Sequence, residues 1–502
     1  MKVKSKNQIK KLNIKPIRCA LPNEQDIAYF TPLSPNASSL SYPWDSVQKS
    51  YSSCVRYDAN FTPEYYAGGQ SANNTVPCDR WLFDPEWNTT VSEWSLVCDK
   101  AWYRGTSDAF LMMGVLLGSL IFGDISDRFG RKPTFMISIL IMDVFGTLAA
   151  FAPDFWTFTA CRLIVGASTS GVFLVAYVLA LEMVGPSKRI IAGTVIHMFF
   201  SIGFLLIAGL AYFVHDWRHL DILVTLPGLI YLAYWWFIPE SARWLISKGR
   251  NEEAKLIIQA VAEENKVILE GFVLDGLLAP SPEEEEKLKA QNDGPKPSIF
   301  ELFRHPNLFK KSVIIFFLWF VCSLTYYGLS WNTANLGGNI YLNFIISGMV
   351  EIPAYLSSML TLDRYGRKNF LCPCLILSGL CLIVSALLPL DLNTVSIVLA
   401  MMGKFFITGA YGAVYIFSAE QFPTVIRNIG IGAGSTFARV GGIFASYTSV
   451  LVEIWLPLPF LMFGVLSLTA GILSLILPET HHKKLPESIA DGENFGKKSS
   501  KS

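Results

Sequence analysis

Charged residues are scarce in this chain, and long polar stretches are confined to a few segments. Only 16% of its 502 residues are charged and 52% are hydrophobic, whereas a soluble domain has about 25% charged residues. This composition excludes an ordinary soluble protein and indicates an integral membrane protein. The net charge of +1 points to no particular partner, because the charges are gathered in separate segments of the chain.

The sequence also lacks the motifs of common enzymes and of ATP-driven pumps. It has no Walker-type phosphate loop, no His-Glu-x-x-His, no Gly-x-Ser-x-Gly and no His/Asp cluster in its apolar segments. We therefore expect that the protein is not an enzyme, that ATP is not its energy source, and that it has no cofactor and no metal site. We expect no nucleic acid as a partner, and the sequence leaves the oligomeric state open.

The first 18 residues are basic and lack an apolar run, so they form neither a secretory signal nor a membrane span. Residues 19–106 are polar and combine four cysteines with four N-glycosylation sequons. Together these features predict an extracellular region closed by disulfides. Four cysteines allow three pairings, and the sequence does not choose among them. The cysteines are Cys19, Cys54, Cys78 and Cys98, and the sequons are at Asn36, Asn60, Asn73 and Asn88.

Eleven apolar segments follow, each near the ~20 residues that a helix needs to cross hydrocarbon. Lys and Arg are concentrated in the loops that this topology assigns to the cytoplasm, as the positive-inside rule requires. We expect residues 239–311 to form a cytoplasmic linker with short amphipathic helices near 251–264, and residues 481–502 to form a disordered tail. The expected spans are 107–123, 133–152, 157–181, 190–213, 220–238, 312–330, 339–360, 369–390, 395–419, 430–450 and 456–477.

Several landmarks of the first half recur in the second half, about 240 residues later. The loop Gly123–Lys132, which mixes acidic and basic residues between two spans, has its counterpart in Asp363–Lys368. This recurrence predicts a duplicated membrane unit, the parallel-repeat plan of a large class of transporters. The other recurring landmarks are Glu182 with Arg189, matched by Glu420 with Arg427, and Pro239-Glu-Ser241, matched by Pro478-Glu-Thr480.

The two halves are unequal, because the second has six spans before its Pro-Glu-Thr and the first has five before its Pro-Glu-Ser. We therefore expect that a first span is missing ahead of Cys19, through a truncated gene model or an alternative start. A genuine eleven-span isoform is the other interpretation.

With these features together, the chain resembles the organic cation/carnitine transporter family of the major facilitator superfamily, and most of all its insect organic cation transporters. The stretch Pro239-Glu-Ser-Ala-Arg-Trp-Leu245 and the large disulfide loop are typical of the family, whereas the loop motif within Gly118–Lys132 indicates only the superfamily. Further matching stretches are Asp216-Trp-Arg218, Gly328–Thr333, Glu351-Ile-Pro353, Glu420–Arg427 and Asp491–Gly496.

The resemblance implies an all-α integral membrane protein with the major facilitator fold. Two six-helix bundles would surround a central cavity, here with eleven spans and the first helix missing, and an extracellular disulfide-bonded loop would precede them. The expected division is a basic leader foreign to the family (1–18), the extracellular glycosylated region (19–106), an N-terminal bundle with helices 2–6 (107–238), a cytoplasmic linker (239–311), a C-terminal bundle with helices 7–12 (312–477) and a cytoplasmic tail (478–502).

A charge inside the membrane costs at least ~2.5–3.5 kcal/mol on insertion scales, so each one needs a reason. Arg439 stands where many cation carriers of the family have an Asp, and resembles the anion and carnitine branches. We expect its guanidinium either to bind a substrate carboxylate or to pair with Glu351. Glu351 in turn either binds the cationic end of a substrate or neutralises Arg439 or Lys404, and the sequence identifies no partner for Asp143.

The resemblance also implies a substrate cavity in which aromatic rings hold ammonium groups through cation–π attraction. The residues expected to line this cavity are Arg439, Glu351, Tyr326, Tyr327, Lys404, Tyr177 and Phe199.

The cytoplasmic charges suggest a gate, because acidic residues accompany the basic ones at matched positions in both halves. Anchoring by the positive-inside rule alone would need no carboxylates. We expect these residues to bridge the two halves, with glycines allowing the tight turn. The set is Gly123, Asp127, Arg128, Gly130, Arg131, Lys132, Glu182, Arg189, Asp363, Arg364, Arg367, Glu420 and Arg427.

The sequence therefore predicts a multi-pass plasma-membrane secondary transporter that carries a small organic ion, a cation or a carnitine-like or amine zwitterion, by alternating access. Its partners would be this small organic ion and the lipid bilayer. The alternatives are an organic anion carrier, because of Arg439, and a transport-inactive truncated isoform without the first helix.

Overall fold

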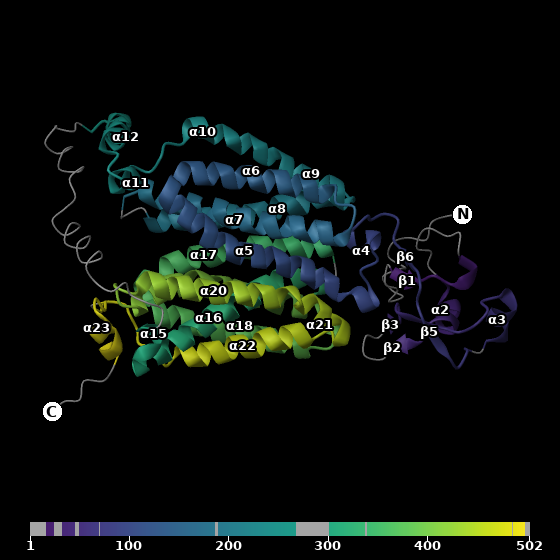
Figure 1. Cartoon of the computed structure of the whole chain (residues 1–502). Coiled ribbons are helices and arrows are strands. Elements are labelled where there is room, and N and C mark those ends of the chain that lie inside the picture. Colours follow the sequence, from purple (N-terminus) through teal and green to yellow (C-terminus); the bar gives the residue numbers. More distant parts are fainter. Residues whose placement is uncertain are drawn as a thin grey trace, which may run out of the picture.

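Long apolar helices, packed side by side, make up most of the computed structural model of the chain (Figure 1). The structure describes residues 17–24, 33–45, 50–69, 71–185, 189–267, 301–336, 339–483 and 485–496. Within this part, nine helices are long and apolar enough to span a membrane. Of the two other expected spans, α22 has 17 residues and α20 is rich in glycine and carries two arginines. All eleven expected spans are thus helical.

The described part of the N-terminal half contains five membrane-crossing elements, and the last of them is irregular. Its sixth family helix is divided into α9, a 3-10 segment η4 and α10, with Pro227 at the start of the 3-10 segment. The elements are α5 (Trp102–Phe129), α6 (Arg131–Ala150), α7 (Phe155–Met183), α8 (Arg189–Phe213), α9 (Trp217–Thr225), η4 (Leu226–Ala233) and α10 (Tyr234–Phe237).

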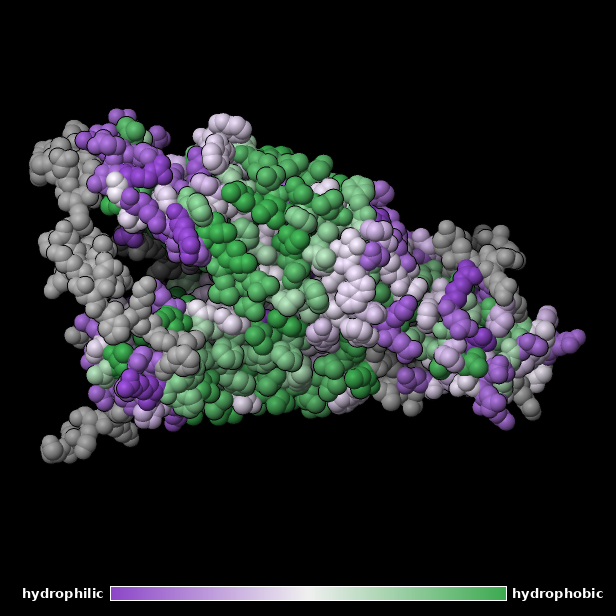
Figure 2. All heavy atoms as spheres, in the orientation of Figure 1, coloured by the Kyte–Doolittle hydropathy of each residue, from purple (hydrophilic) through white to green (hydrophobic). Residues whose placement is uncertain are grey.

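The described part of the C-terminal half contains six membrane-crossing elements, and it holds the largest continuous apolar core of the described chain. The elements are α16 (Pro306–Trp331), η5 (Asn332–Leu336), α17 (Ile340–Tyr365), α18 (Arg367–Leu387), η6 (Leu390–Leu392), α19 (Asn393–Gln421), α20 (Arg427–Ser446), α21 (Thr448–Ile454) and α22 (Leu458–Ser474). An apolar band runs around both halves on the face shown in Figure 2, as expected for the surface that faces lipid.

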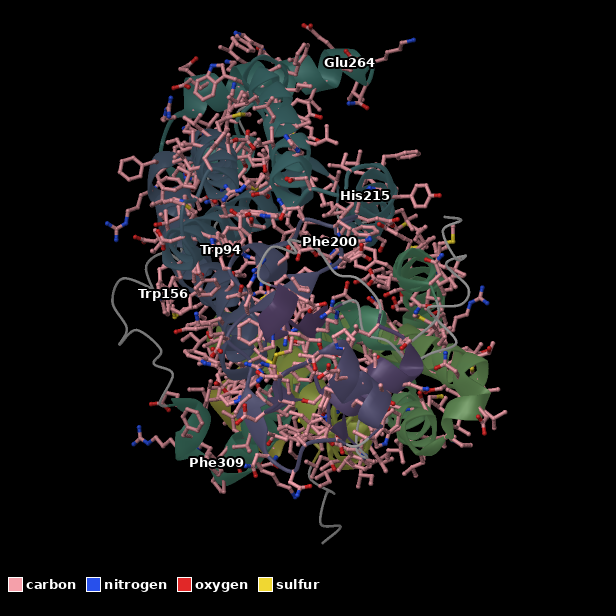
Figure 3. The ribbon with its side chains drawn as sticks, turned by 90° about the vertical axis from the view of Figure 1, so that its right-hand side faces the viewer. Trp94, Trp156, Phe200, His215, Glu264 and Phe309 are labelled. Atoms are coloured by element: carbon pink, nitrogen blue, oxygen red, sulfur yellow. A yellow bond between two sulfur atoms is a disulfide. The ribbon has the colours of Figure 1, made fainter. Side chains whose placement is uncertain are left out.

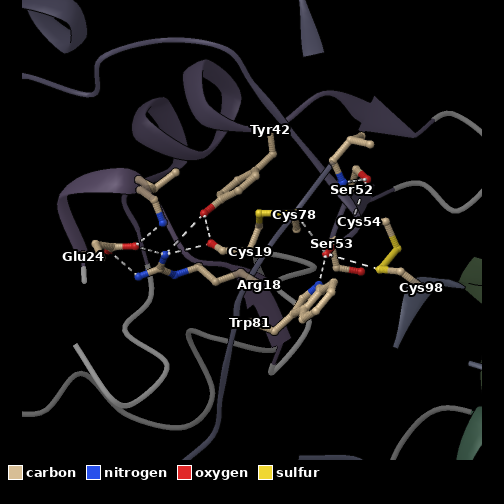
Figure 4. The surroundings of a disulfide bond; sticks show 12 residues. Arg18, Cys19, Glu24, Tyr42, Ser52, Ser53, Cys54, Cys78, Trp81 and Cys98 are labelled. Atoms are coloured by element: carbon tan, nitrogen blue, oxygen red, sulfur yellow. Dashed lines mark hydrogen bonds and ion pairs between the residues drawn. A yellow bond between two sulfur atoms is a disulfide. The ribbon is translucent and has the colours of Figure 1, made fainter. Parts of the chain in front are cut away.

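The described residues of the N-terminal domain, which we expect to be extracellular, form three small antiparallel ribbons, β1–β6, β2–β3 and β4–β5. Disulfides join Cys19 to Cys78 and Cys54 to Cys98 (Figure 4), a pairing that the sequence left open. Its elements are β1 (Ile17–Cys19), η1 (Pro22–Glu24), α2 (Pro35–Ser41), β2 (Trp44–Asp45), β3 (Ser50–Tyr51), β4 (Val55–Tyr57), α3 (Pro63–Gly68), β5 (Thr75–Pro77), β6 (Trp81–Phe83), α4 (Thr90–Glu93) and η2 (Cys98–Lys100). All four sequon asparagines, Asn36, Asn60, Asn73 and Asn88, are exposed to solvent.

The expected boundary between leader and extracellular domain, after residue 18, is two residues too late. Ile17 and Arg18 belong to β1, and the buried Arg18 guanidinium donates to the Glu24 carboxylate and to the Tyr42 hydroxyl (Figure 4). Burial raises the pKa of Tyr42 to about 12. Arg18 can therefore lie in the core of this domain, because the Glu24 carboxylate and the Tyr42 phenol satisfy its guanidinium.

The cytoplasmic segments also differ in part from expectation. The linker has α11 (Ala242–Ser247), α15 (Glu301–Arg304) and α12 (Asn251–Glu264), which confirms the expected helix near 251–264. The expectation of a disordered tail is wrong for residues 485–496, which include α23 (Ile489–Asn494). The Glu493 carboxylate accepts the backbone N–H groups of Asn307 and Leu308 at the start of α16, and Lys311 donates to the carbonyls of Gly492 and Phe495.

In each half, the Pro-Glu motif contacts the loop motif and caps the helix that follows the loop. Gly130 and Gly366, at positive φ, precede α6 and α18, and glycine has no side chain to cap the first N–H groups of a helix. The Glu479 carboxylate accepts the N–H groups of Arg367 and Lys368 at 3.1 Å each. In the first half, Glu240 does the same for the start of α6. The Pro-Glu motif thus supplies the cap that the loop motif lacks.

We expect Glu479→Gln to lower the free energy of unfolding by about 1.5–3 kcal/mol, the range for a hydrogen bond to a charged group. Burial alone would raise the pKa of Glu479, but the donating backbone N–H groups outweigh it and hold the pKa below its usual value. The contribution should therefore be complete at neutral pH and be lost as the pH falls through this lowered pKa. Thermal unfolding in detergent at several pH values measures it. Glu264→Gln, on the exposed end of α12, is the matched control and should change little.

Candidate functional site

A fully buried ion pair lies inside the C-terminal half. Lys404 of α19 and Glu351 of α17 are 2% and 0% exposed, and Lys404 Nζ is 2.9 Å from Glu351 Oε1. The ammonium also donates to the hydroxyls of Ser330 and Ser347 at 2.9 and 2.6 Å. The other carboxylate oxygen accepts the Ser201 hydroxyl at 2.9 Å. The two charges therefore neutralise each other, and serine hydroxyls accept from the ammonium and donate to one carboxylate oxygen, which lowers the cost of burial in an apolar region.

This pair extends across the boundary between the halves, because Ser201 lies on α8 of the N-terminal half. Helix α8 packs against α17 there, and the Gly348 position faces the backbone of Ser201 and the side chain of Phe204. Figure 3 views the molecule from its extracellular end and labels Phe200, of the same helix, near the middle of the view. The pair thus sits where the two halves meet.

Arg439 of α20 does not pair with Glu351, which was one of the two expectations for it. Glu351 forms its ion pair with Lys404, and no carboxylate pairs with Arg439 among the described residues. Its nearest electrostatic partners are the phenol groups of Tyr411, Tyr327 and Tyr415, and its Nε atom has no hydrogen-bond partner in the described chain. Arg439 is half-buried, so its charge can be met by a carboxylate that enters from outside the protein.

The expected tyrosines gather beside these charges. The Tyr326 ring lies 5.3 Å from that of Tyr327 and 5.6 Å from that of Tyr411. Lys404 Nζ lies 5.3 Å from the centroid of the Tyr326 ring, which shows that this ring already faces a cation. The cluster can hold a second ammonium group in the same way where a ring face is free.

The two expected residues of the N-terminal half have different surroundings. The Tyr177 ring stacks at 6.4 Å on His197 of α8, which in turn lies 5.3 Å from Tyr355 of α17. This aromatic chain connects the two halves. Phe199 is 67% exposed, and no ring contact joins it to the cluster in the described chain.

Sequence analysis missed several residues of this site. Ser201, Ser330 and Ser347 carry no sequence signal, because a serine in an apolar helix commonly bonds to its own backbone. Tyr411 and Tyr415 could have been found, since their i, i+4 spacing places both rings on one face of α19.

An apolar groove of about 350 Å³ between α17 and α19, lined by Val350 and Met401 among others, lies elsewhere on these helices and has no charged lining residue.

The cytoplasmic charges form pairs within each half. Arg131 bonds to Asp127 and Glu182, and Arg367 bonds to Asp363 and Glu420. In this structure these pairs do not bridge the halves, and Figure 2 shows a hollow between the two halves at the cytoplasmic end. The remaining members lie as follows: Arg128 beside Asp124, Lys132 over the Trp235 ring, Arg427 against Phe422 and Thr424, Arg364 exposed, Gly123 in ordinary contact with Leu174, and the side chain of Arg189 outside the described residues.

Comparisons with known proteins agree with this architecture. Residues 50–490 match the family described as "Sugar (and other) transporter". The organic cation transporter protein of Drosophila melanogaster is 52% identical over 485 residues, which are 96% of this chain and 87% of that protein. The human organic cation/carnitine transporter 2 is 38% identical over 82% of this chain and 73% of its own length. The chain belongs to the organic cation transporter family.

Solved structures place this transporter in the major facilitator fold. The xylose transporter XylE from E. coli aligns with a TM-score of 0.60 at 17% identity, covering 80% of this chain and 91% of that protein. At this identity the likeness shows the fold alone. The family and the fold together confirm that the protein is a multi-pass membrane transporter of small organic substrates and not an enzyme.

We expect Lys404→Met to destabilise the transporter by about 3–5 kcal/mol, because it leaves the Glu351 charge buried without a partner. Adding Glu351→Gln to this variant should restore most of the stability, since neither charge then remains. The free energy of unfolding in detergent measures both effects. Breaking the exposed pair of Arg250 and Glu253 with Glu253→Gln is the control, with an expected cost below about 1 kcal/mol. Equal costs for the single and double variants would contradict the assignment.

Proposed function

We propose that the protein is a plasma-membrane secondary transporter of small organic cations and zwitterions, which it carries by alternating access. A substrate with both an ammonium group and a carboxylate fits the site best. The observation that carries this proposal is the environment of Arg439, a half-buried guanidinium surrounded by phenols without a carboxylate partner in the described chain. A substrate carboxylate would supply the missing counter-charge.

The ammonium end of the substrate has its own support. Tyr326, Tyr327 and Tyr411 form a cluster in which the Tyr326 ring lies within 6 Å of the other two, and such rings attract ammonium groups by about 0.5–2 kcal/mol each. Glu351 is already neutralised by Lys404, so the rings rather than this carboxylate would hold the cation. The relatives named above carry cations or carnitine by name, and they do not favour the organic-anion and transport-inactive alternatives.

We expect Arg439→Gln to reduce uptake of a labelled carnitine-like zwitterion by about 10–100-fold in kcat/KM, the equivalent of a charged hydrogen bond of about 1.5–3 kcal/mol. Uptake of tetraethylammonium, which has no carboxylate, should be unchanged or increased. Uptake by cells that express each variant at equal surface levels measures both. Arg364→Gln, at an exposed cytoplasmic position, is the matched control. Zwitterion uptake that survives Arg439→Gln would show that another group binds the carboxylate.

Alternating access is supported by the uneven packing between the halves. At the extracellular end Tyr447, which follows α20, packs against Gly105 of α5, where an added Cβ would lie 2.8 Å from the tyrosine ring. Trp87 of the extracellular domain lies 4.4 Å from the His215 ring and 5.9 Å from the Tyr341 ring of α17. With the cytoplasmic end hollowed (Figure 2), we propose that this is the inward-facing state and that the cytoplasmic charges close the opposite mouth in the other state.

We expect Trp87→Ala to loosen the extracellular closure, because the Trp87 ring links the extracellular domain to Tyr341 of the C-terminal half. Removal of one aromatic pair, worth about 0.5–1.5 kcal/mol, would shift the population toward the outward-open state by about two- to tenfold. A membrane-impermeant thiol reagent should then label a cysteine in place of the buried Ser446 faster by that factor. Trp44→Ala is the control, since the Trp44 ring is 54% exposed and packs on Tyr51 of its own domain. Equal labelling in both variants would remove Trp87 from the gate.

A further inference from the structure

Asp143, halfway along α6, is a carboxyl group whose charge nothing nearby stabilises. The residue is 2% exposed. Neither of its carboxyl oxygens has a hydrogen-bond partner among the described residues. It belongs to the N-terminal half and is separate from the site built around Lys404 and Arg439.

The carboxyl group packs against the 3-10 segment η4. A Cβ added at Gly228 would lie only 2.1 Å from Asp143 Oδ1, so the glycine leaves just enough room for the carboxyl. One turn away, a Cβ at Gly146 would lie 2.6 Å from the Thr225 methyl. The two glycines bring α6 and the sixth family helix so close that no space is left for a hydrated ion.

The titratable groups on the elements that pack against α6 do not interact with Asp143. Arg162 of α7 pairs with Asp108 of α5 at 2.7 Å and also acts on Asp221 of α9. Neither carboxyl oxygen of Asp143 is hydrogen-bonded to any of these groups in the described chain. The other titratable groups on these elements are Tyr103, Arg104, Asp124, Asp127 and Arg128 of α5, Cys161, Tyr177 and Glu182 of α7, Arg218 and His219 of α9, and Tyr231 of η4.

We propose that Asp143 is a proton-binding site that holds its proton at neutral pH while η4 packs against the neutral acid. An ionised carboxylate without water, cation or donor is strongly disfavoured inside a membrane, whereas the neutral acid is tolerated there. The proton can leave only when η4 moves away and admits water or a cation. Proton release is thereby coupled to a movement of the sixth family helix, at a 3-10 segment where the helix is already irregular.

The first test compares thermal unfolding of the full chain in lipid nanodiscs with that of Asp143→Asn, over about pH 5 to pH 9. Asn resembles the protonated acid in shape but cannot ionise. Because the unfolded chain releases this proton while the native state keeps it, the unfolding temperature of the wild type should fall relative to that of the variant as the pH rises. Asp124→Asn, in the exposed pair of Asp124 and Arg128, is the matched control and should change the unfolding temperature little at every pH.

The second test labels the unaltered protein and so does not depend on a variant that folds. A hydrophobic carbodiimide adds to a protonated carboxyl group and rearranges to a stable N-acylurea, with every atom of both reactants retained, and mass spectrometry locates the adduct. Because the carbodiimide reacts with the protonated form, we expect an adduct on Asp143 at neutral pH, and less of it on Asp108, which is ion-paired with Arg162.

One outcome would overturn the proposal. Unfolding temperatures of wild type and Asp143→Asn that change in parallel with pH would show that no proton is held at this position. This outcome does not bear on substrate binding at Arg439, because the two sites lie in different halves.

Discussion

The cost of an unmatched charge inside a membrane governs the arrangement of this protein. Lys404 and Glu351 share no sequence neighbourhood, yet α17 and α19 pack so that the ammonium meets the carboxylate at 2.9 Å and serine hydroxyls satisfy the remaining positions. In the other half, Arg162 and Asp108 neutralise each other in the same way, as an ion pair. Arg439 and Asp143 are exceptions, because the described chain offers the first phenols and no carboxylate, and the second no hydrogen-bond partner. Such exceptions are costly, and we propose that a substrate carboxylate compensates Arg439 and a bound proton compensates Asp143.

Each half is stabilised from within by ionic interactions that begin and end in that half. The Pro-Glu carboxylates cap helices whose glycine N-caps cannot cap themselves, and the loop arginines bind carboxylates of their own bundle. Because these interactions recur at matching positions, the two bundles share one plan of internal bracing. Such bracing favours movement of each bundle as a unit, since breaking a charge-assisted hydrogen bond inside a half costs more free energy than separating neutral groups at the boundary.

Much of this fold could be predicted from the sequence, and the reason is physical. A helix in hydrocarbon needs about 20 apolar residues, so spans such as α5 and α16 are visible as apolar runs even though packing decides their ends. Pairings between distant segments were not predictable. The disulfide pairing depends on three ribbons that bring Cys19 to Cys78, and the docked tail depends on Glu493 meeting the start of α16. The partner of Glu351 was left open because Lys404 and Arg439 both lie on helices that could reach it.

The interactions between the halves are of a kind that can be broken and remade. Among the described residues, three hydrogen bonds cross the boundary: the Ser201 hydroxyl to Glu351, the Tyr341 hydroxyl to the Ala211 carbonyl, and the Tyr447 hydroxyl to Thr106. The two between neutral groups contribute about 0.5–1.5 kcal/mol net each and the one to the Glu351 carboxylate about 1.5–3 kcal/mol, and water can replace the partner when an end opens. The difference in free energy between two arrangements of the bundles can then be only a few kcal/mol. A gap of that size lies within the range that differential binding of one small substrate can shift.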